Sequence, residues 1–219
     1  MLEYGKYYHI FNKGAKGISI FIKENDYIHF LDLMSIFLTP VADIYAYALM
    51  GNHLHLVLRI KDKTEIGYLD SEYADSDDIN LKWKTYPVNT SNKTSDSFNK
   101  KPVPGNMLKH MFNSYAQWFN KSHNRSGQLL KHNYDKIIID NVTYLKRLII
   151  YVHNNPVKHG FCEHPVEYGW TSYLSLISIK PTKLSRERVL GWFDDKANFK
   201  IAHNNSNDDF GDIKDLFLE

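Results

Sequence analysis

Two histidines that could bind a metal lie two residues apart in an apolar segment. His53 and His55 alternate with Leu54, Leu56 and Leu58, and successive side chains of a strand point to opposite faces. We therefore expect both imidazoles on one face of a strand and the leucines on the other, in a core. Two adjacent neutral imidazoles are the start of a metal site. The alternative is that each histidine simply hydrogen-bonds to a neighbour.

A second polar group, Tyr-Val-His-Asn-Asn-Pro-Val-Lys-His-Gly, occupies residues 151–160. The sequence predicts a helix that begins at the cap Asp140–Asn141 and ends near Asn155, because a residue before proline is disfavoured in the helical region. Tyr151 and Asn155 are one turn apart, so they share a face of this helix.

The two motifs in this order resemble the His-hydrophobic-His motif and the single-tyrosine helix of the HUH transposases, most closely the branch of REP-associated tyrosine transposases. Two further segments resemble this family: the Asn…Arg-x-Gly segment at 124–127, and Trp-Thr-Ser-Tyr at 170–173, where Thr171 stands in place of the usual Ser. The resemblance covers roughly residues 5–175.

The resemblance implies an enzyme that cleaves and rejoins single-stranded or hairpin DNA. It implies that Tyr151 attacks the phosphate and forms a 5′-phosphotyrosine link, and that His53, His55 and Asn155 bind a divalent metal. A tyrosine hydroxyl, with a pKa of about 10, is a weak nucleophile at neutral pH. A metal on the phosphate would make the bond more receptive. Two imidazoles and an amide oxygen leave positions open, which suits Mg²⁺ or Mn²⁺ better than a closed zinc site.

Two other classes of function remain open at this stage. One is a domesticated nucleic-acid-binding module that kept the fold without cleavage. The other is a metal-dependent phosphoesterase of a different kind built on His53 and His55. The latter needs carboxylate ligands, and only Asp43 and Asp140 lie near either motif.

Composition indicates a folded protein. The chain has 219 residues, of which 43% are hydrophobic and 14% aromatic, enough to bury a sizeable core. The single cysteine, Cys162, excludes an internal disulfide and a cysteine-based zinc cluster, and it fits a reducing cytoplasm. No apolar run is long enough to span a membrane. We expect a cytoplasmic monomer or homodimer.

Positive charge is concentrated around the second motif. Residues 105–160 carry eight Lys or Arg against two Asp, a balance of +6, whereas residues 185–219 have a balance of −3. A phosphate backbone requires such a basic region for affinity, although ordinary solvated surfaces can also carry one. We expect the following residues of this region to contact DNA: Lys109, Arg125, Lys131, His132 and Lys158.

The order of predicted elements is β-α-β-β-α-β-α, which indicates an α+β fold with a ferredoxin-like antiparallel sheet and helices packed on one face. We expect a catalytic domain over residues 1–175, with a polar insertion at about 62–104, and a helical extension over 176–219. The insertion could carry a short strand or helix near 81–86. The predicted elements are strands at 4–13, 43–50, 53–60 and 136–140, and helices at 26–40, 106–121, 140–155 and 189–193.

Overall fold

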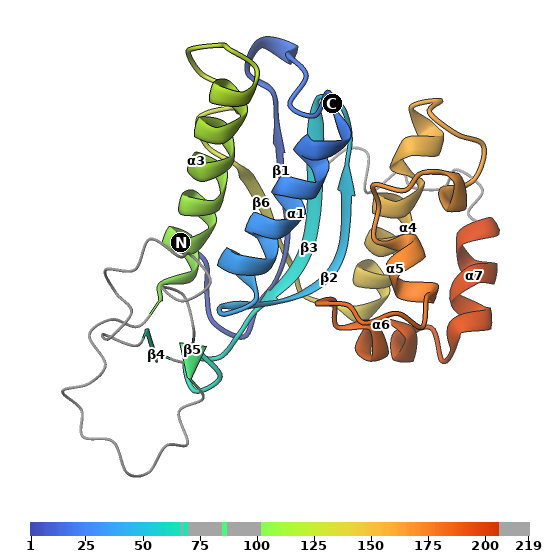
Figure 1. Ribbon diagram of the computed structural model, residues 1–219. Coiled ribbons are helices and arrows are strands. Elements are labelled where there is room, and N and C mark those ends of the chain that lie inside the picture. Colours follow the sequence, from blue (N-terminus) through green and yellow to red (C-terminus); the bar gives the residue numbers. More distant parts are fainter. Residues whose placement is uncertain (67, 70–84, 87–101, 206–219) are drawn as a thin grey trace.

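A four-stranded antiparallel sheet lies at the centre of the computed structural model, which describes residues 1–66, 68–69, 85–86 and 102–205 (Figure 1). Its order is β2-β3-β1-β6, so the first and third strands of the chain are central. This is the arrangement of a ferredoxin-like α+β fold, and the predicted fold class is confirmed. The strands are β1 (Tyr7–Lys13), β2 (Ala42–Leu49), β3 (His53–Ile60) and β6 (Asp135–Ile139).

Helices cover both faces of the sheet, so the prediction of a single covered face is wrong (Figure 1). β3 is buried at seven of its eight positions and therefore needs apolar cover on each side. One face packs against α1 (Glu24–Leu38) and α3 (Pro104–Ser122). The other packs against α4 (Val142–Lys158), followed by α5 (Tyr173–Ile177), α6 (Arg186–Trp192) and α7 (Lys196–Asn204).

The strands predicted at 43–50 and 53–60 form the hairpin of β2 and β3, and although Gly51–Asn52 are residue types that suggest a tight turn with positive φ, the turn has a different backbone. Met50 and His53 exchange backbone hydrogen bonds of 2.8 and 3.3 Å across Gly51–Asn52. Neither turn residue has a positive φ. The Gly51 carbonyl instead accepts hydrogen bonds from the N–H groups of Ile20 and Phe21. The turn is therefore held by the segment that precedes α1.

Helix α4 runs through Pro156 to Lys158, so the predicted end near Asn155 is wrong. Proline lacks the N–H that would bond to the Val152 carbonyl, but it stands in the last turn, where that is the one helical bond lost. The N–H of His159 closes the helix on the Asn155 carbonyl at 3.1 Å. The second motif therefore stays helical up to the residue before His159.

Segments from the C-terminal part of the chain cover the outer edge of β2. The backbone N–H groups of Leu49, Ser172 and Ser185 bond to carbonyls of Trp170, Tyr47 and Ile44 respectively, which leaves less of this strand edge open to pairing with another chain. The residue range of α6 overlaps the helix predicted at 189–193. Helix α7 was not predicted.

Several shorter elements complete the described chain. These are two 3-10 turns, η1 (Ala15–Gly17) and η4 (Pro165–Glu167), and a small pair of strands, β4 (Tyr68–Leu69) and β5 (Thr85–Tyr86). Most of the predicted insertion, including most of 81–86, and the acidic end at 206–219 lie outside the described residues. No helix in the described part of the chain has the length and apolar character to cross a lipid bilayer.

Candidate active site

His53 and His55 lie on the same face of β3, the face covered by α4, as the period of two predicts. The leucines at 54, 56 and 58 are buried in the core on the opposite face. The rings of the two histidines are 5.2 Å apart, at nearly a right angle. His53 is partly exposed, and its Nδ1 is 2.7 Å from the Asn52 side-chain oxygen. The side-chain oxygens of Asn52 and Asn155 can only accept, so a neutral His53 ring donates from one nitrogen to one of them, and the other nitrogen is then an acceptor.

His55 is buried and contacts a third histidine, His9 of β1. His55 Nδ1 lies 2.9 Å from His9 Nε2. Burial lowers the pKa of His9 to about 3. Burial first, and then the nearby His9 and His53 rings, hold the pKa of His55 well below its ordinary value. Both rings are therefore neutral at pH 7, the form of histidine that binds metals.

Helix α4 brings Tyr151 and Asn155 to these histidines. The Asn155 side-chain oxygen is 3.0 Å from His53 Nε2, although the two residues are 102 positions apart in the chain. The Tyr151 ring meets the His55 ring edge to face, with their centroids 6.0 Å apart. Lys158, two turns further along α4, holds its ammonium 4.0 Å from the centre of the Tyr151 ring. Tyr151 is 2% exposed and Asn155 is fully buried.

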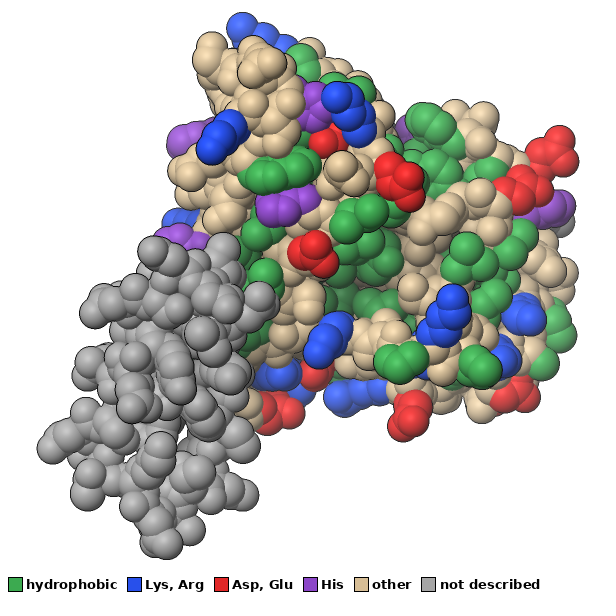
Figure 2. Space-filling view, viewed as in Figure 1, with side chains coloured by type: hydrophobic (Ala, Val, Ile, Leu, Met, Phe, Trp, Pro, Cys, Tyr) green, Lys and Arg blue, Asp and Glu red, His purple; other side chains and the backbone are tan. Residues whose placement is uncertain are grey.

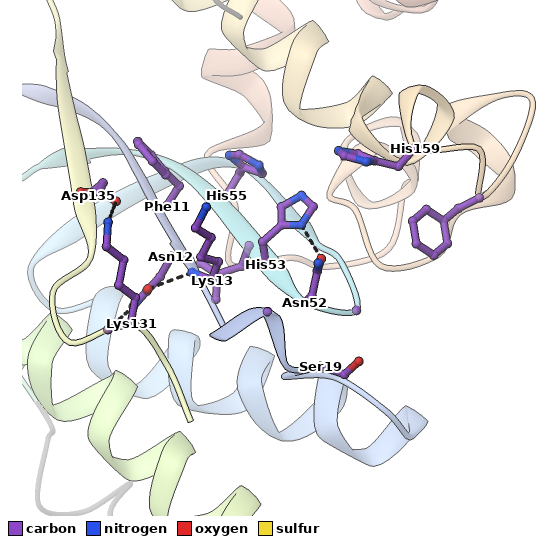
Figure 3. Close-up of a pocket in the computed structure, with 14 residues that line it drawn as sticks. Phe11, Asn12, Lys13, Ser19, Asn52, His53, His55, Lys131, Asp135 and His159 are labelled. Carbon is purple, nitrogen blue, oxygen red and sulfur yellow. Dashed lines mark hydrogen bonds and ion pairs between the residues drawn. The ribbon is translucent and has the colours of Figure 1, made fainter. Parts of the chain in front are cut away.

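A cavity of about 560 Å³ opens in front of the histidine pair (Figure 3). His159 and Phe161, which follow α4, form one of its walls, and Lys131 and Asp135, which precede and begin β6, form another. In Figure 3 the His53, His55 and His159 rings lie on one side, and the Lys131–Asp135 ion pair of 3.1 Å lies on the other. Tyr151 does not belong to the residues that line this cavity; its ring lies behind His55.

The side chains of His53, His55 and Asn155 offer donor atoms that suit a small hard cation; the two histidines line the cavity, and Asn155 is fully buried. Neighbouring ligands of an octahedral Mg²⁺, each at about 2.1 Å, are about 3.0 Å apart, which is the separation of His53 Nε2 and Asn155 Oδ1. When His53 Nδ1 carries the proton, both atoms are acceptors and a shared cation would hold them at this distance; when Nε2 carries it, the same contact is an ordinary hydrogen bond. His55 can offer Nε2 if its Nδ1–H donates to His9, a contact that would also fix its orientation.

Among the described residues, no group of three or more His, Cys, Asp or Glu side chains is arranged to hold a metal. The donor set above is of a different type, with two histidines and an amide.

A series of buried hydrogen bonds holds α4 in place. His203 Nδ1 is 2.7 Å from the Phe199 carbonyl, which can only accept. His203 Nε2 therefore accepts from His153 Nδ1 at 2.8 Å, and His153 Nε2 accepts from the Ser172 hydroxyl at 2.6 Å. Ser172 Oγ in turn accepts from the backbone N–H of Tyr47 at 2.9 Å.

The His153 and His203 rings both stay neutral, as the directions of the hydrogen bonds require. Burial first, and then the His203 ring, hold the pKa of His153 well below its ordinary value. Burial lowers the pKa of His203 to about 4. Since His153 lies on α4 between Tyr151 and Asn155, the chain of bonds links the position of this segment to α7 and β2.

The residues predicted to contact DNA lie in three environments. Lys131 lines the main cavity, and together with Lys109 and His132 it also lines a hollow of about 200 Å³ beside α3. Arg125 donates to the Asn120 side chain and the Gln128 carbonyl, so it braces its own loop. Lys158 packs on Tyr151.

Figure 2 shows basic and acidic side chains interspersed over the described part of the face in view. Cations near the histidine pair are Lys13, which pairs with His53 across β1 and β3, and Lys158, which packs on Tyr151.

The two carboxylates considered as ligands for a phosphoesterase, Asp43 and Asp140, do not line the cavity. Asp43 pairs with Arg59 at 3.0 Å, and Asp140 accepts from the Asn141 side chain. Among the described residues, the carboxylate that lines the cavity is Asp135. It is separated from His55 by β1, so two strand spacings, about 10 Å, lie between their backbones.

Residues of the site that the sequence did not indicate include His9, Lys13, Asp135, His159 and Phe161. The alternation of Tyr7, His9 and Phe11 with Tyr8 and Ile10 places a histidine on the same face as two aromatic rings, and this was the available signal for His9. The strand pairing that brings it to His55 is not visible in the sequence.

Comparisons with known proteins yield a likeness of fold. No protein-family model matches the chain, and no curated protein matches it. Among solved structures, the chain is similar to a REP-associated tyrosine transposase bound to a REP hairpin, with a TM-score of 0.53 and 10% sequence identity. The match covers 83% of this chain and 86% of that chain. At this identity the likeness shows a shared fold, and it agrees with the sheet order and helix placement described above.

Proposed function

We propose that this chain is a metal-dependent enzyme that cleaves and rejoins single-stranded DNA, at hairpin or palindromic sites, through a covalent link to Tyr151. The observation that carries the proposal is the meeting of two distant motifs: His53 Nε2 and Asn155 Oδ1 at 3.0 Å, and the Tyr151 ring against His55. The solved structure of similar fold is a tyrosine transposase bound to a DNA hairpin, which supports the same class of activity.

In this proposal His53, His55 and Asn155 hold Mg²⁺ or Mn²⁺. The metal, when bound, would withdraw charge from a phosphate oxygen and orient the scissile bond. His9 keeps the His55 ring in place through the 2.9 Å contact. The side chains at the wall of the cavity, Lys131 above all, attract the phosphate backbone.

The reaction balances without an external energy source. The Tyr151 oxygen attacks phosphorus, the bond to the 3′ oxygen of the preceding nucleotide breaks, and that oxygen takes up a proton to become a free 3′ hydroxyl. The proton of Tyr151 leaves as the new bond forms. A 3′ hydroxyl can reverse the same displacement, so rejoining needs no ATP.

Tyr151 must be uncovered for this attack, since it is 2% exposed and lies under Lys158. Reacting atoms have to approach to about 3–3.5 Å. A phosphate that enters the site would form an ion pair with the Lys158 ammonium. This ion pair is stronger than the cation–π contact between Lys158 and the Tyr151 ring. We infer that the incoming strand draws Lys158 off the ring and so exposes the nucleophile.

The burial of Tyr151 also favours a second candidate function, a DNA-binding module that does not cleave. The two functions differ in one product, a covalent protein–DNA adduct. The test is to incubate the chain with hairpin oligonucleotides that carry single-stranded flanks, in Mg²⁺ or Mn²⁺, and to look for an adduct that survives denaturation.

Wild-type protein is expected to form the adduct with metal and to lose it with a chelator, and Tyr151→Phe is expected to bind DNA without forming it. His53→Ala and His55→Ala should abolish cleavage while the fold is kept. Binding of DNA with no adduct in either metal would establish the non-cleaving module instead.

A further inference from the structure

An aromatic side chain stands exposed at the wall of the candidate active site. Phe161 is 59% exposed, yet it lines the same cavity as His53, His55 and His159. Single exposed apolar side chains are common on protein surfaces, but this ring faces a cavity that three imidazoles also line, where a bound ligand would cover it. The only ring contact recorded for Phe161 among the described residues is edge to face with Tyr168, at 6.0 Å.

The backbone holds this ring in a fixed position. The Phe161 N–H donates to the Pro156 carbonyl at 2.9 Å, and the Gly160 N–H donates to the Val157 carbonyl at 3.0 Å. Gly160 has φ +72°, a conformation that glycine adopts without strain, and it turns the chain back from the end of α4. The turn therefore presents His159 and Phe161 together to the cavity, as a built feature of the helix end.

The opposite wall of the cavity has the complementary chemistry. Lys131 lies there in its ion pair with Asp135, and Lys13 lines the cavity beside His53. Cations bind phosphates, whereas an aromatic ring binds the face of a base. A single strand that lies across the cavity would thus meet cations on one side and a stacking surface on the other. Duplex DNA hides the faces of its bases in the stack, so the arrangement selects an unpaired nucleotide.

We propose that Phe161 is a stacking platform for one unpaired base next to the phosphate bound at His53 and His55. This inference rests on the proposed function, since it requires that single-stranded DNA enters the cavity. The inference adds to the proposed function a binding site for one nucleotide and names the residue that positions its base. Stacking tolerates any base, so the subsite fixes the position of the strand and not its sequence.

The test measures DNA binding and does not depend on cleavage. All variants are made in a Tyr151→Phe background and titrated by fluorescence anisotropy with a labelled hairpin oligonucleotide that has single-stranded flanks. Phe161→Ala is expected to weaken binding about 5- to 150-fold, the loss of one base stack. Phe161→Trp should keep the affinity, and Phe161→Leu, which is apolar but not aromatic, should lose most of it. Ile179→Ala is the matched control, because Ile179 is 93% exposed and does not line the cavity.

A scan with abasic sites then identifies the base. One flank position is expected to weaken binding when its base is removed, and at that position the Phe161→Ala substitution should cause no further loss. If Phe161→Ala binds within twofold of the parent, or if its effect adds fully to that of every abasic site, the stacking assignment is wrong while DNA binding stands. If the parent protein binds neither the hairpin nor its isolated flank, the proposed function fails and the inference fails with it.

Discussion

Ser172→Ala tests whether the buried hydrogen bonds behind α4 stabilise the fold in the direction assigned to them. The hydroxyl donates to His153 Nε2 at 2.6 Å and accepts from the Tyr47 N–H at 2.9 Å. A second possible acceptor, the Tyr47 carbonyl, is 3.4 Å away, so the shorter bond to His153 takes the proton. Ser172 and His153 are both 0% exposed, so water does not replace either partner without opening the structure.

The expected cost follows from the two groups left without partners. A buried donor or acceptor that loses its partner costs about 1–3 kcal/mol, so the substitution should lower the free energy of unfolding by about 2–6 kcal/mol. For a chain of this size each kcal/mol shifts Tm by about 2–4 °C. Even the lower value corresponds to a shift of about 4 °C, well within the resolution of thermal or chemical denaturation.

Ser178→Ala provides the control for this experiment. It makes the same chemical change, but the Ser178 hydroxyl accepts from an exposed backbone N–H, that of Lys180. Its effect should stay within about 0.5 kcal/mol. Equal effects of the two substitutions would refute the view that the Ser172 hydroxyl bridges two otherwise unpaired buried groups.

Three further outcomes follow from the structure. Gly14→Ala would put a Cβ atom 1.9 Å from the Ile18 carbonyl oxygen, so it should unfold or strongly destabilise the chain in denaturant titrations. As a control, Gly191→Ala lies in helix α6, and its Cβ atom would meet nothing within 4 Å, so it should be neutral or mildly stabilising. Burial raises the pKa of Asp26, but hydrogen bonds from the backbone at the start of α1 and from His123 outweigh it and leave that pKa lowered. Its contribution to stability is therefore complete above the unfolded value of about 3.9 and is lost as pH falls through the lower folded value, and Asp26→Asn should flatten this acid limb in pH-dependent denaturation. If three lysines each hold one phosphate, affinity for single-stranded DNA should fall about 20-fold between about 50 and 200 mM salt, and a flat salt dependence in binding titrations would count against the basic contacts.

Local patterns in the sequence were sufficient to place the histidine pair. The alternation around His53 and His55 requires one polar and one apolar face, and a strand has no other way to arrange them. The helix of Tyr151 and Asn155 was predicted for a similar reason. The end of this helix was predicted wrongly. A residue before proline disfavours the helical conformation, but this is a local effect, and packing of the last turn, where Pro156 is buried, overrides it.

The parts of the site that depend on pairing between distant segments could not be read from the sequence. His9 meets His55 because β1 lies beside β3, and Asp135 reaches the cavity because β6 lies on the other side of β1. The covering of a second face by helices was missed for a related reason: Val57 and its neighbours on β2 are apolar on the side that also carries the histidines. A strand with polar residues at one end can thus be buried at the other.

The most direct test of the central claim is to map the residue joined to DNA in the trapped adduct. Wild-type protein is incubated with a hairpin oligonucleotide in Mn²⁺ or Mg²⁺, denatured and digested, and the peptide that carries the nucleotide is identified by mass spectrometry. We predict attachment through the Tyr151 oxygen to a 5′ phosphate, with no adduct from Tyr151→Phe and a reduced yield from Asn155→Ala that rises with metal concentration. Attachment at Tyr144, at Tyr115 or at any other residue would contradict it, even if the chain proved to cleave DNA.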